Sequence, residues 1–142
     1  MNTIDTRDLI EERNDLKEQI LNSFLDSFEH YEDQTDSYED ILFEEEEIQD
    51  WKEVWEDEIQ AIKEIDDLEE EVNSYAGDDF EDGVYLIDED DFEEYTEEFL
   101  KECGYISPDF PSWIEIDWGA TANNVKVDYS EVEFRGTTYL YR

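Results

Sequence analysis

The sequence predicts an α+β protein, with long acidic helices in its N-terminal half and a small mixed unit that ends in a β-hairpin. Up to about residue 75, apolar residues recur at steps of three and four, as on one face of a helix. Short runs rich in β-branched and aromatic residues appear only later. Aromatic residues make up 15% of the chain, enough to build a core under a highly charged surface. We therefore expect an acidic helical region, residues 1–83, and a small α+β unit, residues 84–142.

The first helix is predicted from about Thr6 to Phe28. Its apolar stripe is formed by Leu9, Leu16, Ile20, Phe24 and Phe28. A break is expected around His30–Asp36, where the apolar period is lost.

A second helical region is predicted to begin near Ser37, since Asp40 stands three residues later in the pattern of an N-terminal cap. It should continue to about Tyr75, with a break near Asp50, and Gly77 suits a helix stop. The expected buried stripe comprises Ile41, Ile48, Trp51, Trp55, Ile59, Ile62, Leu68, Val72 and Tyr75.

The mixed unit should open with a short strand, Val84–Ile87. Asp88 can cap a following helix, Glu89–Cys103, which Gly104 would end. Four of its residues are expected to face inward: Phe92, Tyr95, Phe99 and Cys103.

The last part of the chain should contain a Pro-rich turn, one more helix and a hairpin. The turn holds Pro108 and Pro111, and Asp117 can cap the helix to about Val125. The predicted extended and hairpin segments are Trp113–Ile116, Glu131–Phe134, a turn at Arg135-Gly136, and Thr137–Tyr141.

The strongest feature of the composition is charge: 47 acids stand against nine Lys plus Arg, for a formal net charge of −38. The excess lies in residues 23–102, which hold 35 acids and three of those bases. A nucleic-acid backbone and an anionic membrane would both repel such a chain. Ordinary solvated surfaces mix charges of both signs, so this asymmetry favours a basic protein as partner.

Acids spaced four residues apart lie on one helix face and could imitate a row of DNA phosphates. The charge of residues 23–102 matches about 54 Å of duplex, at one charge per ~1.7 Å. The candidate partner-binding acids are Asp36, Asp40, Glu44, Glu46, Asp50, Glu53, Glu56, Asp57, Glu70, Glu93 and Glu97.

A calcium loop is a weaker alternative, for which Asp78, Asp82 and Glu89 are the candidate ligands. Asp78, Asp82 and Glu89 fall on positions one, five and twelve of such a loop, and Gly83 falls on position six. Phe80 occupies position three, where an oxygen ligand is needed.

No catalytic pattern or phosphate-binding loop is evident, so we expect neither enzymatic activity nor a cofactor. His30 stands alone, and Cys103 lies on an apolar stripe as a core residue. The one cysteine, the missing signal pattern and the lack of a long apolar run favour a cytoplasmic protein.

From Phe92 onward the sequence resembles the C-terminal region of the ArdA-type antirestriction proteins. The shared features are a helix that ends at Gly104, a turn with Pro108 and Pro111, and a Tyr139-Leu140-Tyr141 strand. Between them stands Ile116-Asp117-Trp118-Gly119-Ala120, with Asp128 following. The resemblance covers about a third of the chain, and the N-terminal helices have no counterpart in it.

The resemblance implies an acidic DNA mimic of phage or plasmid origin that occupies the DNA-binding groove of a restriction–modification enzyme. A CRISPR effector in the host bacterial cytoplasm is an equally suitable target for such a surface. Family members are dimers, and Trp113 and Trp118 could serve a homodimer interface. The alternative function is an acidic chaperone that sequesters basic DNA-binding proteins.

Overall fold

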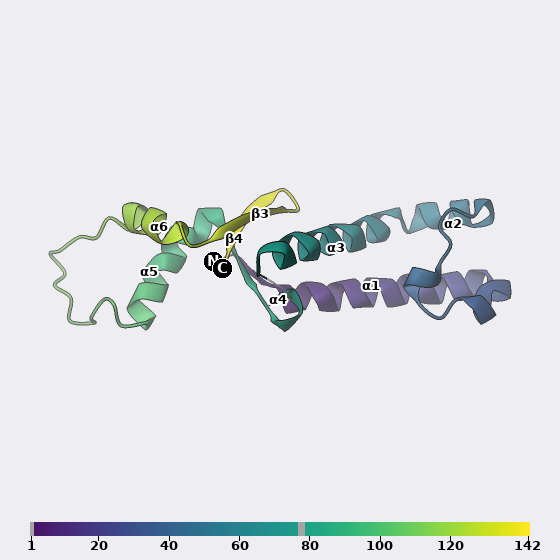
Figure 1. Ribbon diagram of the computed structural model, residues 1–142, viewed down its shortest axis with the longest axis horizontal. Coiled ribbons are helices and arrows are strands. Elements are labelled where there is room, and N and C mark those ends of the chain that lie inside the picture. Colours follow the sequence, from purple (N-terminus) through teal and green to yellow (C-terminus); the bar gives the residue numbers. More distant parts are fainter. Residues whose placement is uncertain (1, 77–78) are drawn as a thin grey trace. The chain divides into compact units, whose positions relative to one another are not determined.

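The computed structural model describes residues 2–76 and 79–142 of the chain, apart from the side chains of residues 75 and 76 (Figure 1). It has the predicted α+β class. The chain forms two compact units. We call residues 8–69 the helical hairpin, and residues 1–7 together with 70–142 the sheet unit.

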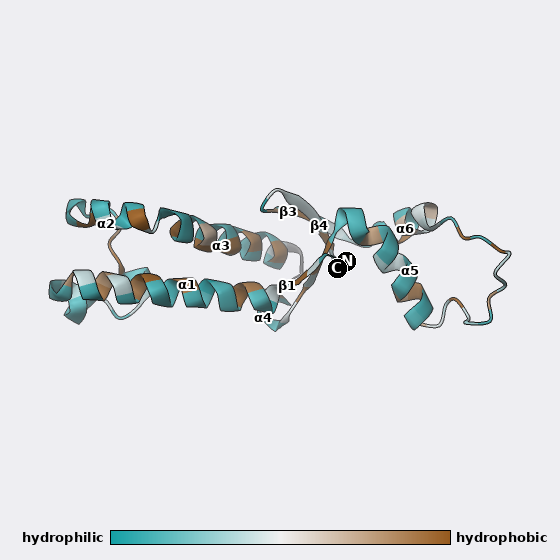
Figure 2. Cartoon of the chain, turned by 180° about the vertical axis from the view of Figure 1, so that it is seen from behind, coloured by the Kyte–Doolittle hydropathy of each residue, from teal (hydrophilic) through white to brown (hydrophobic). Residues whose placement is uncertain are grey.

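The helical hairpin is built on two long helices, α1 (Thr6–Ser27) and α3 (Glu56–Ala76), which lie side by side (Figure 1). Between them the chain forms four short helices: η1 (Glu29–Gln34), η2 (Tyr38–Asp40), η3 (Glu46–Ile48) and α2 (Gln49–Val54). Each long helix is mostly hydrophilic with apolar patches, as Figure 2 shows. This is the amphipathic pattern that the apolar period predicted.

The core of the hairpin draws on every one of its segments. Ile20 and Phe24 of α1 are buried with Ile41, Ile48 and Ile62. An aromatic layer packs against them, formed by Phe28, Tyr31, Tyr38, Phe43, Trp51 and Trp55. Most predicted stripe residues are thus buried or half-buried, while the side chain of Tyr75 lies outside the described residues.

The predicted helix from Ser37 is wrong over residues 41–45, which are not helical. The Asp40 carboxylate closes a single short turn, since it accepts the backbone N–H groups of Asp36 and Ser37 at 3.0 and 3.1 Å. Helical structure resumes only at η3, within the run of acids from Glu44 to Glu47, where like charges weaken a helix. The later break falls at Trp55 and not near Asp50.

The sheet unit contains one antiparallel sheet in the order β1-β2-β4-β3. Its strands are β1 (Thr3–Asp5), β2 (Tyr85–Asp88), β3 (Ser130–Phe134) and β4 (Thr137–Tyr141). Its helices are α4 (Asp79–Asp82), η4 (Glu89–Asp91), α5 (Phe92–Glu102) and α6 (Trp118–Lys126). Ile87 and Leu140, paired across β2 and β4, form a core with Phe92 of α5 and Ala122 of α6.

The division into units differs from the predicted boundary at residue 83 because the N-terminus joins the sheet. Ile4 in β1 pairs with Leu86 in β2. The buried Thr6 hydroxyl then donates to the Phe80 carbonyl at 2.7 Å and accepts the Val84 N–H at 2.8 Å. A strand of three residues is too short to show a period, so no sequence pattern predicts it.

The predicted caps and hairpin of the sheet unit are confirmed. Asp88 accepts the Asp90 N–H at 3.0 Å, and Asp117 accepts the Ala120 N–H at 3.0 Å. Gly104 follows α5 at φ +79°, in the left-handed region that ends many helices. The β3–β4 turn has positive φ at both Arg135 and Gly136.

Within residues 2–76 and 79–142, no helix combines the length and apolar character needed to cross a bilayer. Gly77, the predicted helix stop, lies outside the described residues.

Candidate protein-binding surface

The helical hairpin carries most of the charge imbalance. Its sequence contains 25 acids against four Lys plus Arg, a formal net charge of −21. The sheet unit contains 22 acids against five bases, a net charge of −17 over a longer stretch of chain. Both units are acidic, but charge is denser on the hairpin.

Two of the hairpin's basic residues are used to hold it together. The Arg13 guanidinium lies 2.8 Å from Asp66 and 2.6 Å from Glu69, joining α1 to α3. Partial burial lowers the pKa of Arg13, but hydrogen bonds and charge from Glu69 and Asp66 outweigh this effect and leave it raised. Lys17 binds Glu39 at 2.6 Å. These cations therefore face the hairpin's own carboxylates and neutralise few of the others.

Five of the predicted partner-binding acids lie along one continuous stretch of the hairpin. Glu46 is in η3, Asp50 and Glu53 are in α2, and Glu56 and Asp57 begin α3. All five side chains are exposed. Within the part of the chain that the structure describes, none of the five forms an ion pair, so their charges are available to a partner.

The predicted row Asp36, Asp40 and Glu44 does not form, because no single helix spans these residues. All three are exposed, but the Asp40 carboxylate turns back to the backbone N–H groups of Asp36 and Ser37. Those hydrogen bonds hold the pKa of Asp40 below its usual value. Asp40 thus has a local structural role in addition to its charge.

Three predicted acids belong to the sheet unit. Glu70 and Glu93 are exposed, on α3 and α5. Glu97 forms an exposed ion pair with Lys101, at 2.7 Å, one turn further along α5.

Sequence reasoning missed an acidic row on α1, formed by Asp8, Glu11, Asp15 and Glu18. The four residues recur at steps of three and four and are all exposed. Residues 1–22 hold six acids and three bases, and this ordinary ratio hid the row. In the structure Arg13 and Lys17 bind acids of other segments, so the row keeps its charge.

Two of the calcium-loop candidates, Asp82 and Glu89, lie in different elements. Asp82 ends α4, β2 follows it, and Glu89 begins η4, where it lies 3.4 Å from Lys126. Asp78 lies outside the described residues. Among the residues that are described, no three His, Cys, Asp or Glu side chains form a group able to hold a metal ion.

Cys103 and His30 do not form a catalytic site with the residues described above. Cys103 is exposed, so its prediction as a core residue is wrong. The α5 stripe ends before it, and the buried Thr96 faces inward instead. His30 is exposed, 3.4 Å from Glu47.

Comparison with known protein families, curated proteins and solved structures found no match for this chain.

Proposed function

We propose that the helical hairpin is a DNA mimic that binds the DNA-binding groove of a bacterial defence enzyme. In this proposal the protein serves a phage or mobile element inside the host cell, and its target is a restriction–modification enzyme or a CRISPR effector. It makes and breaks no bond, and acts by excluding DNA.

The observation that carries this proposal is the charge of the hairpin relative to its length. Helix α1 has 22 residues, and at 1.5 Å per residue it is about 33 Å long. A B-DNA segment of that length carries about 19 phosphate charges, at one per ~1.7 Å. The net charge of the hairpin is −21. A basic groove that binds about ten base pairs of DNA would thus encounter a similar number of negative charges on the hairpin.

The core beneath this charge makes mimicry a better explanation than a flexible acidic tail. Phe24 contacts Trp51 with ring centroids 5.4 Å apart, and both the Trp51 and Trp55 indoles donate to Ser23 Oγ at 2.9 and 3.1 Å. These contacts fix the helices that carry the acids. Binding by fixed charges costs less conformational entropy than binding by a disordered chain.

The first experiment is capture of partners from bacterial lysate with this protein as bait, eluted in steps of rising salt, with and without competing duplex DNA. Mimicry predicts recovery of one DNA-binding complex that duplex DNA displaces. Recovery of many small basic proteins would instead support the acidic chaperone. A partner that duplex DNA cannot displace would contradict mimicry.

A purified target then permits a quantitative test. The affinity of the complex should fall steeply with salt, as that of the same enzyme for duplex DNA does, because each ligand releases the counter-ions of its negative charges when it enters the basic groove. An affinity that does not change between low and high salt would exclude charge as the driving force.

A further inference from the structure

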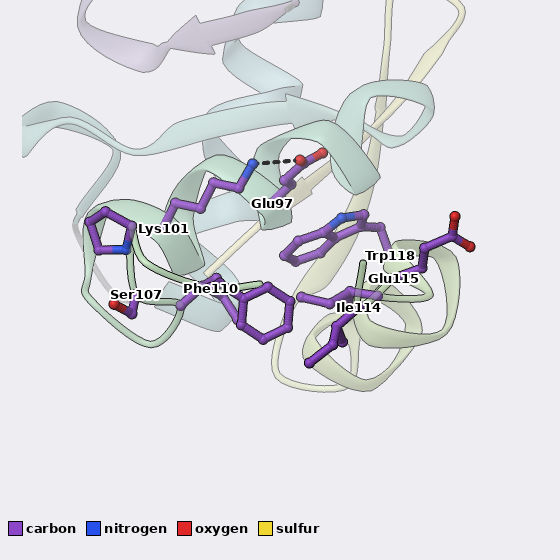
Figure 3. Close-up of a pocket in the computed structure, with 10 residues that line it drawn as sticks. Glu97, Lys101, Ser107, Phe110, Ile114, Glu115 and Trp118 are labelled. Atoms are coloured by element: carbon purple, nitrogen blue, oxygen red, sulfur yellow. Dashed lines mark hydrogen bonds and ion pairs between the residues drawn. The ribbon is translucent and has the colours of Figure 1, made fainter. Parts of the chain in front are cut away.

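The sheet unit contains an apolar groove between the C-terminal half of α5 and the chain that follows it. Its volume is about 690 Å³. Its apolar lining is formed by Ile106, Pro108, Phe110, Ile114, Ile116 and Trp118. Figure 3 shows the Phe110 ring and the Ile114 side chain beside the Trp118 indole. The volume lies in the range of sites that enclose small ligands or a few side chains.

The segment that forms one wall of the groove exposes large apolar side chains to solvent. Residues 105–117 contain no regular helix or strand. Phe110 is 36% exposed and Ile114 is 40% exposed, and both line the groove. Trp113, on the same segment, is 81% exposed but is not part of the lining. A cluster of large exposed apolar side chains is typical of a binding surface.

The charges beside the groove select the kind of partner. Its one lining cation, Lys101, lies 2.7 Å from Glu97 and 6.0 Å from the centre of the Trp118 ring. The lining also contains two carboxylates, Glu97 and Glu115. Glu97 offsets the charge of Lys101, so the lining as a whole carries one net negative charge, that of Glu115. The apolar groove thus has a net negative lining, within a unit whose net charge is −17.

We propose that this groove binds a short segment of a partner protein in which one or two large apolar side chains are flanked by Lys or Arg. The apolar side chains would fill the space beside Trp118, and a basic residue would face Glu115. A second copy of the chain suits the groove poorly, because it would bring another acidic surface to the same negative lining. The proposal rests on residues outside the helical hairpin and stands or falls independently of DNA mimicry.

The test is a selection of short phage-displayed random peptides on the full chain, at a salt concentration of about 0.15 M, where the screening length is about 8 Å. Enriched peptides are then titrated in solution against four proteins. These are the unchanged chain, the double variant Phe110→Ser with Ile114→Ser, the charge variant Glu115→Lys, and Trp113→Ser as the matched control. Circular dichroism establishes that each variant is folded, and Ile114→Ser alone replaces the double variant if that one does not fold.

The expected peptides carry an aromatic or large aliphatic residue beside Lys or Arg. The double variant should bind them at least about tenfold more weakly, since two apolar contacts are lost. Glu115→Lys should weaken binding severalfold, and Trp113→Ser should leave it nearly unchanged. Enrichment of purely basic peptides, of apolar peptides without a cation, or of none would overturn the proposal, as would equal binding by the double variant. A dimer in sedimentation that the double variant converts to a monomer would also overturn it, in favour of self-association.

Discussion

The helical hairpin and the sheet unit place their apolar residues differently, although both are acidic. The hairpin packs its aromatic residues inward around Ile20 and Phe24. The sheet unit leaves Tyr105 and Trp113 among its most exposed large apolar residues, on the segment that lines an apolar groove. A partner therefore meets mainly charge on the hairpin, and both charge and apolar surface on the sheet unit.

This difference shows how a strongly acidic surface can be combined with a fixed structure. Like charges repel and destabilise the compact state, so the residues beneath them must offset the repulsion. In the hairpin an aromatic layer and the Arg13 ion pairs provide this stabilisation. The sheet unit uses a four-stranded sheet with capped helices, and its exposed apolar residues are free to bind.

The largest expected effect comes from removing the centre of the hairpin core. Phe24 is 2% exposed and contacts three aromatic rings. Phe24→Ala should lower the free energy of unfolding of the hairpin by about 3–5 kcal/mol, because a large cavity is left. The matched control is Val54→Ala, whose side chain is 75% exposed and which should change stability by less than about 0.5 kcal/mol.

Hydrogen exchange in urea would measure both variants, with separate readings for amides of residues 8–69 and of the sheet unit. Equal loss of protection in both regions would show that the two units unfold as one. No loss in the hairpin would contradict the assignment of Phe24 to its core.

The second largest effect is expected on the affinity for a captured target, when acids are removed from the hairpin. One variant replaces six exposed hairpin acids by their amides: Glu44, Glu46, Asp50, Glu53, Glu56 and Asp57. The control replaces six exposed acids of the sheet unit: Glu81, Asp90, Glu94, Glu102, Glu131 and Glu133. We expect the hairpin variant to bind a captured target about 100-fold more weakly or worse, since each phosphate-like contact adds to the salt-dependent term.

The control variant should lose less than about tenfold, through the long-range field alone. Single substitutions should have small effects, because an isolated surface charge contributes little. Equal losses in the two six-residue variants would mean that net charge, and not the surface of the hairpin, determines binding.

The features predicted correctly from the sequence depend on residues close together in the chain. The caps at Asp88 and Asp117 and the turn at Arg135-Gly136 each involve a few neighbouring residues. The amphipathic stripes of α1 and α3 are local for the same reason. Such signals need no knowledge of the rest of the fold.

The features that were missed depend on contacts between distant parts of the chain. The β1 strand is stabilised by β2 and by Thr6, which bonds to residues more than 70 positions away. Residues 41–45 are not helical, and Ile41 among them packs into the hairpin core against Ile20 and Phe24 of α1 and Ile62 of α3. Neither the β1 pairing nor the packing of Ile41 leaves a periodic pattern in the sequence.

The candidate site was predictable in kind and less so in detail. The excess of acids indicated a basic partner, and most of the predicted acids are exposed. The row from Asp8 to Glu18 was hidden because Arg13 and Lys17 stand between its members, and only the structure shows these cations bound elsewhere. The apolar groove requires the path of residues 105–117 around Trp118, which no local pattern specifies.

A third prediction separates structural from solvated cations in the hairpin. The Arg13 side chain is 12% exposed and joins two carboxylates of α3. Arg13→Ala should cost about 2 kcal/mol of stability, because charged hydrogen bonds are lost and acids are left facing one another. Lys63→Ala, which removes the same charge from an exposed position, should cost little. Thermal unfolding in matched buffers measures both, and similar losses would show that net charge matters more than the Arg13 ion pairs.

The smallest effect is expected at Asp40, whose charge stabilises a turn. Hydrogen bonds from the backbone of Asp36 and Ser37 lower the pKa of Asp40 from its usual value of 3.8. A group whose pKa is lowered by folding contributes stability above its unfolded pKa, and that contribution is lost as the pH falls through the folded value. Asp40→Asn should therefore destabilise the hairpin slightly at neutral pH, and the difference should shrink as the pH falls below 3.8.

Glu44→Gln, at an exposed position nearby, is the control for removing one negative charge. It relieves repulsion without breaking the turn, so the two variants should shift the unfolding midpoint in opposite directions. A shift of the same sign in both would show that repulsion outweighs the turn even at Asp40.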